Sequence, residues 1–175
     1  MAILLVFFLS LQPLTLSLNQ EGIYLQRVKL GLSDPAGVLS DWNEHDDTTC
    51  NWTGVTCDNS VTCSVESVDL SNAGLAGPFP TFLCSLPSLS NLSLSSTTSS
   101  IRHSLSPLRS DLSRNQISGQ IPANLCENGT LMELLLISNS FTGNIPASLG
   151  EFSTLIRVLL RTNGLFGEVP EGFWE

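Results

Sequence analysis

Charge is scarce in this chain, and basic charge most of all. Lys and Arg together number 7 against 16 Asp and Glu, so the formal net charge is −9. A surface this poor in basic residues repels the phosphates of nucleic acids and of anionic membranes, which argues against both as partners. Histidine is also rare, since the chain has only His45 and His103, and neither lies in a recognisable nucleophile or zinc motif.

Signatures of catalysis are missing as well. The sequence has no Gly-rich phosphate loop and no protein-kinase signature. The acidic cluster from Glu44 to Asp47 is interpreted as a solvated loop rather than a cation site. We therefore predict that the chain is not an enzyme and binds neither a cofactor nor a metal ion.

Long apolar runs are absent after the first residues. Residues 1–18, MAILLVFFLSLQPLTLSL, contain an apolar stretch from Ala2 to Leu11 that is too short to span about 30 Å of hydrocarbon. We predict a secretory signal cleaved near Ser17 or Leu18; because the usual basic start is missing, a hydrophobic anchor is the competing interpretation. No later stretch is long enough to cross a membrane, so we expect the mature chain to lack a span of its own.

Cysteines and glycosylation acceptors fit this secretory route. Cys50 and Cys57 are close enough in sequence to clip a small unit, and a disulfide closing such a short loop contributes about 2–3 kcal/mol. The total of five cysteines is odd, so at least one thiol stays unpaired. The acceptor triplets are weaker evidence, because a chain rich in Ser and Thr contains some by chance. They begin at Asn51, Asn91 and Asn128.

An internal repeat dominates the second half of the chain. The frame LxxLxLxxNxFxGxIPxxL recurs in phase, with Pro122, Pro146 and Pro170 spaced 24 and 24 residues apart. Period-two alternation predicts one short strand in each repeat, for example with Val158 and Leu160 pointing inward. Stacked repeats then share a core that exists only between neighbours. The predicted strands are Val68 to Leu70, Leu92 to Leu94, Leu134 to Leu136 and Val158 to Leu160.

An Asn and a Gly follow each strand of the repeat. The Asn side chains are expected to stack in a ladder and to bond backbone groups of the turning chain. The Gly permits a tight bend, and the Ile-Pro or Val-Pro step after it favours extended backbone before a short helical or 3₁₀ return. We thus predict an α/β solenoid with a parallel sheet on its concave face and an irregular convex side. These residues are Asn115, Asn139 and Asn163, with Gly119, Gly143 and Gly167.

Residues 19–64 follow a different pattern. Leu25, Val28 and Leu32 lie at helical spacing, with Ile23 beside them, after a possible Asn19 cap. A solenoid end exposes its apolar core, so a terminal unit must cover it. We predict that this helix and the segment through Cys57 form an N-terminal cap.

These motifs carry a family resemblance. LNQEGIYLQRVKLGLSDPAGVLSDWN followed by CNWTGVTC resembles the cap of plant leucine-rich-repeat receptor-like kinases, and the GxIP repeats are similar to their 24-residue type. GPFPTFLCSLPSL and PANLCENGTLMELLLISNSFTG resemble HAESA-type receptors, which bind secreted peptide hormones. The resemblance implies an extracellular peptide-binding region whose partner is a peptide or a co-receptor ectodomain. The intact relative is a single-pass plasma-membrane protein with a cytoplasmic Ser/Thr kinase domain, of which this sequence contains nothing.

Two other functions stay open. One is a secreted defence protein similar to the polygalacturonase inhibitors, which share the cap and the GxIP repeat. The other is a small co-receptor ectodomain. Both are expected to end in a C-terminal cap, which this sequence lacks, so we favour a shortened and truncated receptor.

The repeat frame breaks between Pro80 and Pro122, which lie 42 residues apart where two repeats of 24 need 48. Within this span, the stretch from Ser95 to Ser110 lacks the strand-end Asn, the Gly and the apolar spacing. We interpret it as a seam at which central repeats are lost, with a natural irregular loop as the alternative. The predicted organisation is a signal at 1–18, the cap at 19–64, the first repeat and the start of the second at 65–94, the seam at 95–110, and truncated plant-type repeats at 111–175.

Outward positions on two strands are the candidate ligand-binding residues. Arg157 and Arg161 flank Leu159 and can hold a carboxylate or sulfate of a peptide. A solvated strand face is the competing interpretation. The same positions one repeat earlier hold Glu133, Leu135 and Ile137.

The family also bears on the cysteines. HAESA-like receptors pair cysteines at the places of Cys84 and Cys126 with one in the following repeat, and here that partner is absent. If the seam fills one coil, the two lie about 10 Å apart, beyond the roughly 7 Å between Cα atoms that a disulfide tolerates. We expect a single bridge, Cys50 to Cys57, with Cys63, Cys84 and Cys126 as thiols.

Overall fold

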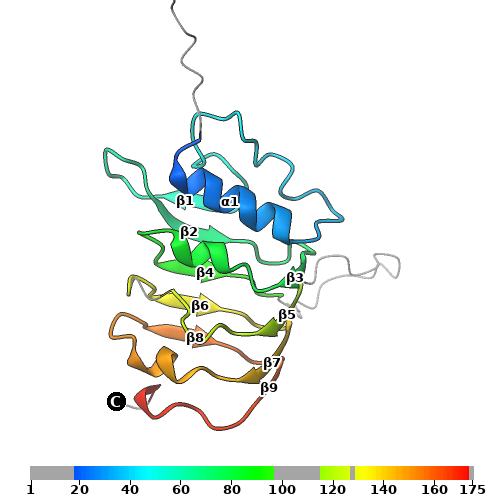
Figure 1. Cartoon of the computed structure of the whole chain (residues 1–175), viewed down its shortest axis with the longest axis vertical. Coiled ribbons are helices and arrows are strands. Elements are labelled where there is room, and N and C mark those ends of the chain that lie inside the picture. The colour runs from blue at the N-terminus through cyan, green and yellow to red at the C-terminus, as the bar shows by residue number, and fades with distance from the viewer. Residues whose placement is uncertain (1–17, 97–114, 127–128, 174–175) are drawn as a thin grey trace, which may run out of the picture.

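The computed structural model describes residues 18–96, 115–126 and 129–173. The predicted signal up to Ser17, most of the predicted seam and the acceptor Asn128 lie outside these ranges. The described chain is a solenoid of stacked coils with one α-helix, α1 (Gln20–Gly31), across its first coil (Figure 1). The predicted solenoid with an N-terminal helical cap is therefore confirmed.

The helix α1 begins and packs as its sequence predicts. The side-chain oxygen of Asn19 accepts a hydrogen bond from the backbone N–H of Gly22 at 2.8 Å, which satisfies one of the free donors of the first turn. Leu25 and Val28 are buried against the core. Ile23, expected beside them, is 39% exposed and lies on the outer side of the helix.

The rest of the cap is held by aromatic and disulfide contacts. The rings of Trp42 and Trp52 stack with centroids 5.5 Å apart, and the indole N–H of Trp42 donates to the carbonyl of Thr53 at 3.0 Å. The expected bridge between Cys50 and Cys57 is present, with Cα atoms 5.5 Å apart. These contacts fix the cap as one packed unit over the first coil.

The main sheet has the strand order β1-β2-β4-β6-β8. β1 (Val55–Cys57) comes from the cap and pairs antiparallel with β2 (Val65–Asp69). Each of the next strands contributes one step of a parallel ladder, which confirms the predicted strands within a few residues. They are β4 (Asn91–Ser93), β6 (Glu133–Leu135) and β8 (Arg157–Leu159), and their partners run in one register through Val68, Leu92, Leu134 and Val158.

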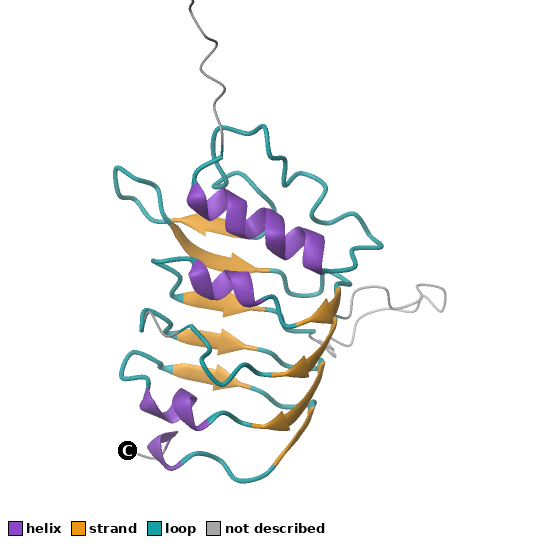
Figure 2. Cartoon of the chain, viewed as in Figure 1, coloured by secondary structure: helices purple, strands orange, loops and turns teal. Residues whose placement is uncertain are grey.

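A second parallel sheet lies beside the first and was not predicted (Figure 2). It forms where the sequence indicated only a bend and extended backbone. The repeat glycines lie in or next to these strands with positive φ, for example 88° at Gly119 and 84° at Gly143, a region that other residues rarely adopt. The strands are β3 (Ala76–Pro78), β5 (Gln116–Gln120), β7 (Ser140–Asn144) and β9 (Gly164–Phe166).

The return of each coil is irregular or 3₁₀-helical, as expected for the convex side. Three short 3₁₀ segments stand there, η1 (Thr81–Ser85), η2 (Ala147–Glu151) and η3 (Glu171–Phe173). We number the coils by their strands in the main sheet: coil one contains β2, coil two β4, coil three β6 and coil four β8. The core lies between the 3₁₀ segments and the two sheets, and coils one to three supply most of its fully buried leucines.

The predicted Asn ladder is present and strictly periodic. Asn139 donates to the carbonyl of Leu136 in its own coil and to that of Leu94 in the coil before. Its side-chain oxygen accepts from the backbone N–H of Ile117. Asn163 repeats this pattern with Leu160, Leu136 and Phe141.

Asn115 makes the same bonds even though its strand ends far earlier in the sequence. Its amide donates to the carbonyls of Leu94 at 2.9 Å and Leu70 at 2.7 Å, and its oxygen accepts from Leu75. Leu94 thus stands to Asn115 as Leu136 stands to Asn139. The spacing is 21 residues instead of 3, and the difference of 18 equals the length of the stretch 97–114.

The interpretation of 95–110 as a coil-filling seam is therefore wrong. The 42 residues between Pro80 and Pro122 are one repeat of 24 with 18 additional residues, not two shortened repeats. Ser95 and Ser96, assigned to the seam, are buried in coil two, where Ser96 donates to the carbonyl of Ile137. The loss of central repeats stays a prediction.

The expectation of free thiols at Cys84 and Cys126 is wrong for the same reason. Because β4 pairs directly with β6 and β3 with β5, the two cysteines lie in adjacent coils. Their Cα atoms are 4.2 Å apart and they form a disulfide. Cys63 is exposed and is the one free cysteine in the described part of the chain.

Candidate ligand-binding surface

The outward side chains of the main sheet form three columns across the strands. We call this side of the sheet the concave face. The first column contains Ser67, Asn91, Glu133 and Arg157, the second Asp69, Ser93, Leu135 and Leu159. The third column lies two residues further along each strand, and its side chains continue the same alternation. It contains Ser71, Ser95, Ile137 and Arg161.

The face changes character from the cap towards the last strand. Beside the cap it is polar and small, with Ser67, Ser93 and the exposed Asp69. On β6 and β8 it combines leucines with charged residues. This contrast places the mixed, partly apolar region at the strands that carry the predicted ligand-binding residues.

Glu133 and Arg157 are brought together. They are register partners on β6 and β8, and the guanidinium Nη1 of Arg157 lies 3.4 Å from the carboxylate Oε1 of Glu133. Both side chains keep access to solvent, so the pair contributes little to stability. The charge of Arg157 is accordingly partly neutralised, whereas Arg161 is exposed and has no ion pair among the described residues.

Leu135 and Leu159 are neighbours in the second column. Leu135 is half-buried and Leu159 is 38% exposed. Ile137 was expected to contact a ligand, but its side chain is only 8% exposed and offers little surface to one. Its backbone N–H donates to the Ser95 hydroxyl, and Ser96 donates to its carbonyl, so the end of β4 packs against it.

Sequence reasoning missed two apolar side chains at the border of this surface. Met132 is 40% exposed and Ile156 is 75% exposed, and each directly precedes its strand. The backbone N–H of Ile156 donates to the carbonyl of Met132, so the two residues lie in adjacent coils at one level. Both occupy a variable position of the LxxL frame, so the repeat pattern did not mark them as surface residues.

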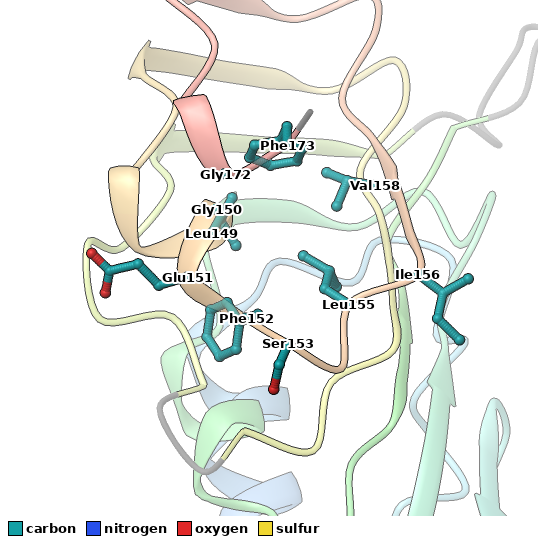
Figure 3. A pocket seen from close by; sticks show the side chains of 10 residues that line it. All are labelled: Leu149, Gly150, Glu151, Phe152, Ser153, Leu155, Ile156, Val158, Gly172 and Phe173. Carbon is teal, nitrogen blue, oxygen red and sulfur yellow. The ribbon is translucent and has the colours of Figure 1, made fainter. Parts of the chain in front are cut away.

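A depression of 580 Å³ lies elsewhere, at the last described coil. Its apolar lining comes from Leu149, Phe152, Leu155, Val158 and Phe173, several of which are inward residues of coils three and four (Figure 3). Its position between η2 and η3, among side chains of the core, identifies it as the exposed edge of the solenoid core. It contributes no polar constellation suited to catalysis.

Two of the predicted glycosylation acceptors lie in the described residues. Asn51 is exposed in a cap turn, whereas Asn91 is half-buried and is the first residue of β4. In residues 18–96, 115–126 and 129–173 no group of His, Cys, Asp and Glu is placed to hold a metal ion. No helix of that same part is long and apolar enough to cross a membrane.

Known proteins share this architecture. The family model of the leucine rich repeat N-terminal domain matches residues 18–58. The BIR2 ectodomain from Arabidopsis thaliana is 32% identical with a TM-score of 0.72, and the match covers 89% of this chain and 73% of that one. The chain belongs to the leucine-rich-repeat ectodomains of plant receptor-like kinases.

Within this family the sequence is closer in identity to HAESA-type proteins. Receptor-like protein kinase HSL1 of Arabidopsis thaliana is 52% identical over 90 residues, which make up 51% of this chain. Those residues span about a tenth of that kinase, 9% of its length. The ectodomain of the Arabidopsis receptor kinase HAESA, solved with the peptide hormone IDA and the co-receptor SERK1, is 42% identical with a TM-score of 0.59. That match covers 89% of this chain and 27% of the HAESA chain.

Proposed function

We propose that this chain is an extracellular peptide-binding region of a receptor-like kinase and has no catalytic activity of its own. The observation that carries the proposal is the mixed surface on β6 and β8, at the end of a parallel sheet whose other strands present small polar residues. The identity to HAESA, whose ectodomain was solved with a peptide hormone, supports a peptide as the ligand.

The surface suits an extended peptide with an apolar residue and a terminal or side-chain anion. Leu159 and Leu135 supply adjacent apolar contacts, and Ile156 widens the apolar area at the border. Arg161 supplies a charge that no ion pair offsets among the described residues, and its planar guanidinium binds a carboxylate or sulfate through two hydrogen bonds. Arg157 joins it if the ligand displaces Glu133.

The proposal also implies binding partners and an extracellular location for the chain. A secreted peptide is the first partner, and a co-receptor ectodomain is the second, as SERK1 is in the HAESA structure. Residues 1–18 direct the chain into the secretory pathway, where the Cys50–Cys57 and Cys84–Cys126 bridges form. The face is then presented outside the cell.

Peptide capture tests the proposal. The full chain is secreted from plant cells, purified, immobilised and exposed to peptides extracted from plant extracellular fluid, and the retained peptides are identified by mass spectrometry. A Leu159→Asp/Arg161→Glu variant reverses the chemistry at two exposed positions without touching the core. Val61→Ser, at a fully exposed cap-loop position, is the matched control.

We expect the wild type and the control to retain a common set of peptides that the double variant loses, because interface residues of this kind typically change affinity tenfold or more, about 1.4 kcal/mol. A folded wild type that retains no peptide beyond those of the double variant contradicts the proposal.

A further inference from the structure

The three predicted glycosylation acceptors are not equivalent, because one of them is an entire strand of the main sheet. The triplet Asn91-Leu92-Ser93 is β4 itself. Leu92 is fully buried, so Asn91 and Ser93 point to the concave face. We propose that Asn91 carries an N-linked glycan that shields the cap-side part of the concave face and favours ligand contact at the other end, where Leu135, Leu159 and Arg161 lie. This inference rests on the concave face being the binding face.

The local contacts of Asn91 accept the modification. Its Nδ2 donates one hydrogen bond, to the hydroxyl of Ser90 at 3.1 Å, and a primary amide has two such hydrogens. The sugar replaces one hydrogen and leaves the other for Ser90. The Asn91 side chain is half-buried rather than enclosed, so the chain can fold around a substituted amide.

The order of synthesis favours modification before the fold closes. In the folded chain the Ser93 hydroxyl, which the acceptor triplet requires, is bonded to the Ser71 hydroxyl at 2.5 Å. The partner strand β6 begins with Glu133, 42 residues after Asn91. At about 5–20 residues per second, synthesis of that stretch takes roughly 2–8 s, during which the β6 side of β4 has no partner strand.

Register decides what the glycan covers. Asn91 lies between Ser67 on β2 and Glu133 on β6, each one strand spacing of about 4.8 Å away. Arg157 is two spacings away, and Leu159 and Arg161 lie further along the chain on the same side. The sugars attached at Asn91 therefore lie nearest Ser67, Asp69, Ser93 and Glu133, whereas Leu159 and Arg161 are further from the attachment point.

Occupancy and shielding are both measurable without a ligand. The full chain is secreted from plant cells, and peptide mapping determines whether Asn91 and Asn51 carry glycans. Carboxylates are then labelled with a carbodiimide and an amine, before and after an endoglycosidase trims each glycan to a single sugar. Asn91→Gln, which keeps the amide, and Asn51→Gln, at an exposed cap position, form the matched pair of variants.

We expect a glycan on Asn91 and a several-fold rise in labelling of Asp69 and Glu133 on trimming or in Asn91→Gln. Labelling of Glu151, on the convex η2, should not change, and Asn51→Gln should leave all three carboxylates as in the wild type. An unmodified Asn91 in the folded, secreted protein overturns the inference, as does equal labelling of Glu133 with the full and the trimmed glycan. Because neither readout uses a peptide, a failure of peptide capture leaves this result standing and contradicts only the proposed function.

Discussion

The two ends of the solenoid use the same repeat frame with very different burial. In the coils beside the cap, the inward residues Val68, Leu70 and Leu92 are at most 2% exposed. In the last described coil, the equivalent Val158 and Leu160 are only half-buried. The sequence letters are alike, so the difference comes from neighbours: a coil between two others buries its leucines on both sides, and an edge coil on one.

The largest effect should come from breaking this contrast in the core. Leu136→Ala removes a fully buried side chain between coils two and four and should cost about 2–5 kcal/mol of unfolding free energy. Leu160→Ala, at the equivalent edge position, should cost clearly less, on the order of 1–2 kcal/mol, because less apolar area is lost.

Urea unfolding followed by circular dichroism measures both variants. Arg157→Ala is the control on the solvent side of the same strand pair, and removing its exposed ion pair with Glu133 should change stability by no more than about 0.5 kcal/mol. Equal losses of unfolding free energy for Leu136→Ala and Leu160→Ala would contradict the inference that a coil with two neighbours gains more from its buried leucines than an edge coil.

The second test concerns the staple between coils one and two. The Cys84–Cys126 bridge closes a loop of 42 residues, so its removal by a Cys84→Ala/Cys126→Ala double variant should cost about 3–4 kcal/mol by loop entropy. The bridge of the cap, which closes a separation of only 7, should contribute about 2–3 kcal/mol on the same scale.

Thermal unfolding under non-reducing conditions compares the two bridge variants, with Cys63→Ser as the neutral control. Alkylation of the denatured, unreduced protein should find a single thiol, at Cys63. Three thiols would restore the expectation drawn from the sequence and would contradict the direct stacking of coils one and two.

The sequence specified the periodic parts of this fold far better than the interrupted one. Strand positions, the Asn ladder and the helix cap follow from local alternation and from fixed spacings, which are visible in one sequence. The status of residues 97–114 as an addition to one repeat could not be predicted in this way. The 42 residues between Pro80 and Pro122 fit two shortened repeats about as well as one repeat with additional residues. Only the bonds of Asn115 to Leu94 and Leu70 distinguish the two.

Three features that the sequence did not predict also have physical causes. Alternation correctly placed Ile137 on the concave face. Its exposure of only 8% results from contact with Ser95 and Ser96, which follow β4 and which the sequence analysis had assigned to the seam. The second sheet escaped prediction because its strands are only three to five residues long and contain or adjoin a glycine that was interpreted as a bend, although Ser140–Asn144 does alternate exposed and buried residues. Met132 and Ile156 were missed because a variable position carries no pattern of its own.

A deletion sharpens the comparison between coil two and coil three. Removing residues 97–114 joins Ser96 to Asn115 and gives coil two the spacing that coil three already has. Losing these 18 residues should leave stability unchanged or raise it by up to about 2 kcal/mol, because a shorter segment costs less entropy to close. Non-reducing peptide mapping should still find Cys84 linked to Cys126, and an unfolded or unlinked product would show that coil two requires those residues.

The smallest expected effect on stability concerns the contact between the N-terminal cap helix α1 and strand β2. Glu21 of α1 is 8% exposed, and its carboxylate accepts the backbone N–H of Val65, the first residue of β2, at 3.2 Å. Burial raises the pKa of Glu21 above its ordinary value near 4.5, the hydrogen bond from Val65 opposes this rise, and the negative charge of Asp58 adds to it. The folded state therefore holds this proton more tightly than the unfolded chain. Its stabilising contribution is complete below the ordinary pKa and is lost as the pH rises through the raised value.

Glu21→Gln tests this sign, because the amide keeps an acceptor for Val65 but cannot ionise. Unfolding free energies of both proteins are measured between pH 4 and pH 7, and the variant minus wild-type difference should increase as the pH rises above about 4.5. Glu66→Gln, which removes an exposed carboxylate from the neighbouring strand β2, is the matched control for the loss of one negative charge. A difference that stays flat would mean that burial and the Val65 hydrogen bond cancel, and one that falls towards neutral pH would mean that the hydrogen bond outweighs burial and that Glu21 holds the cap as an anion.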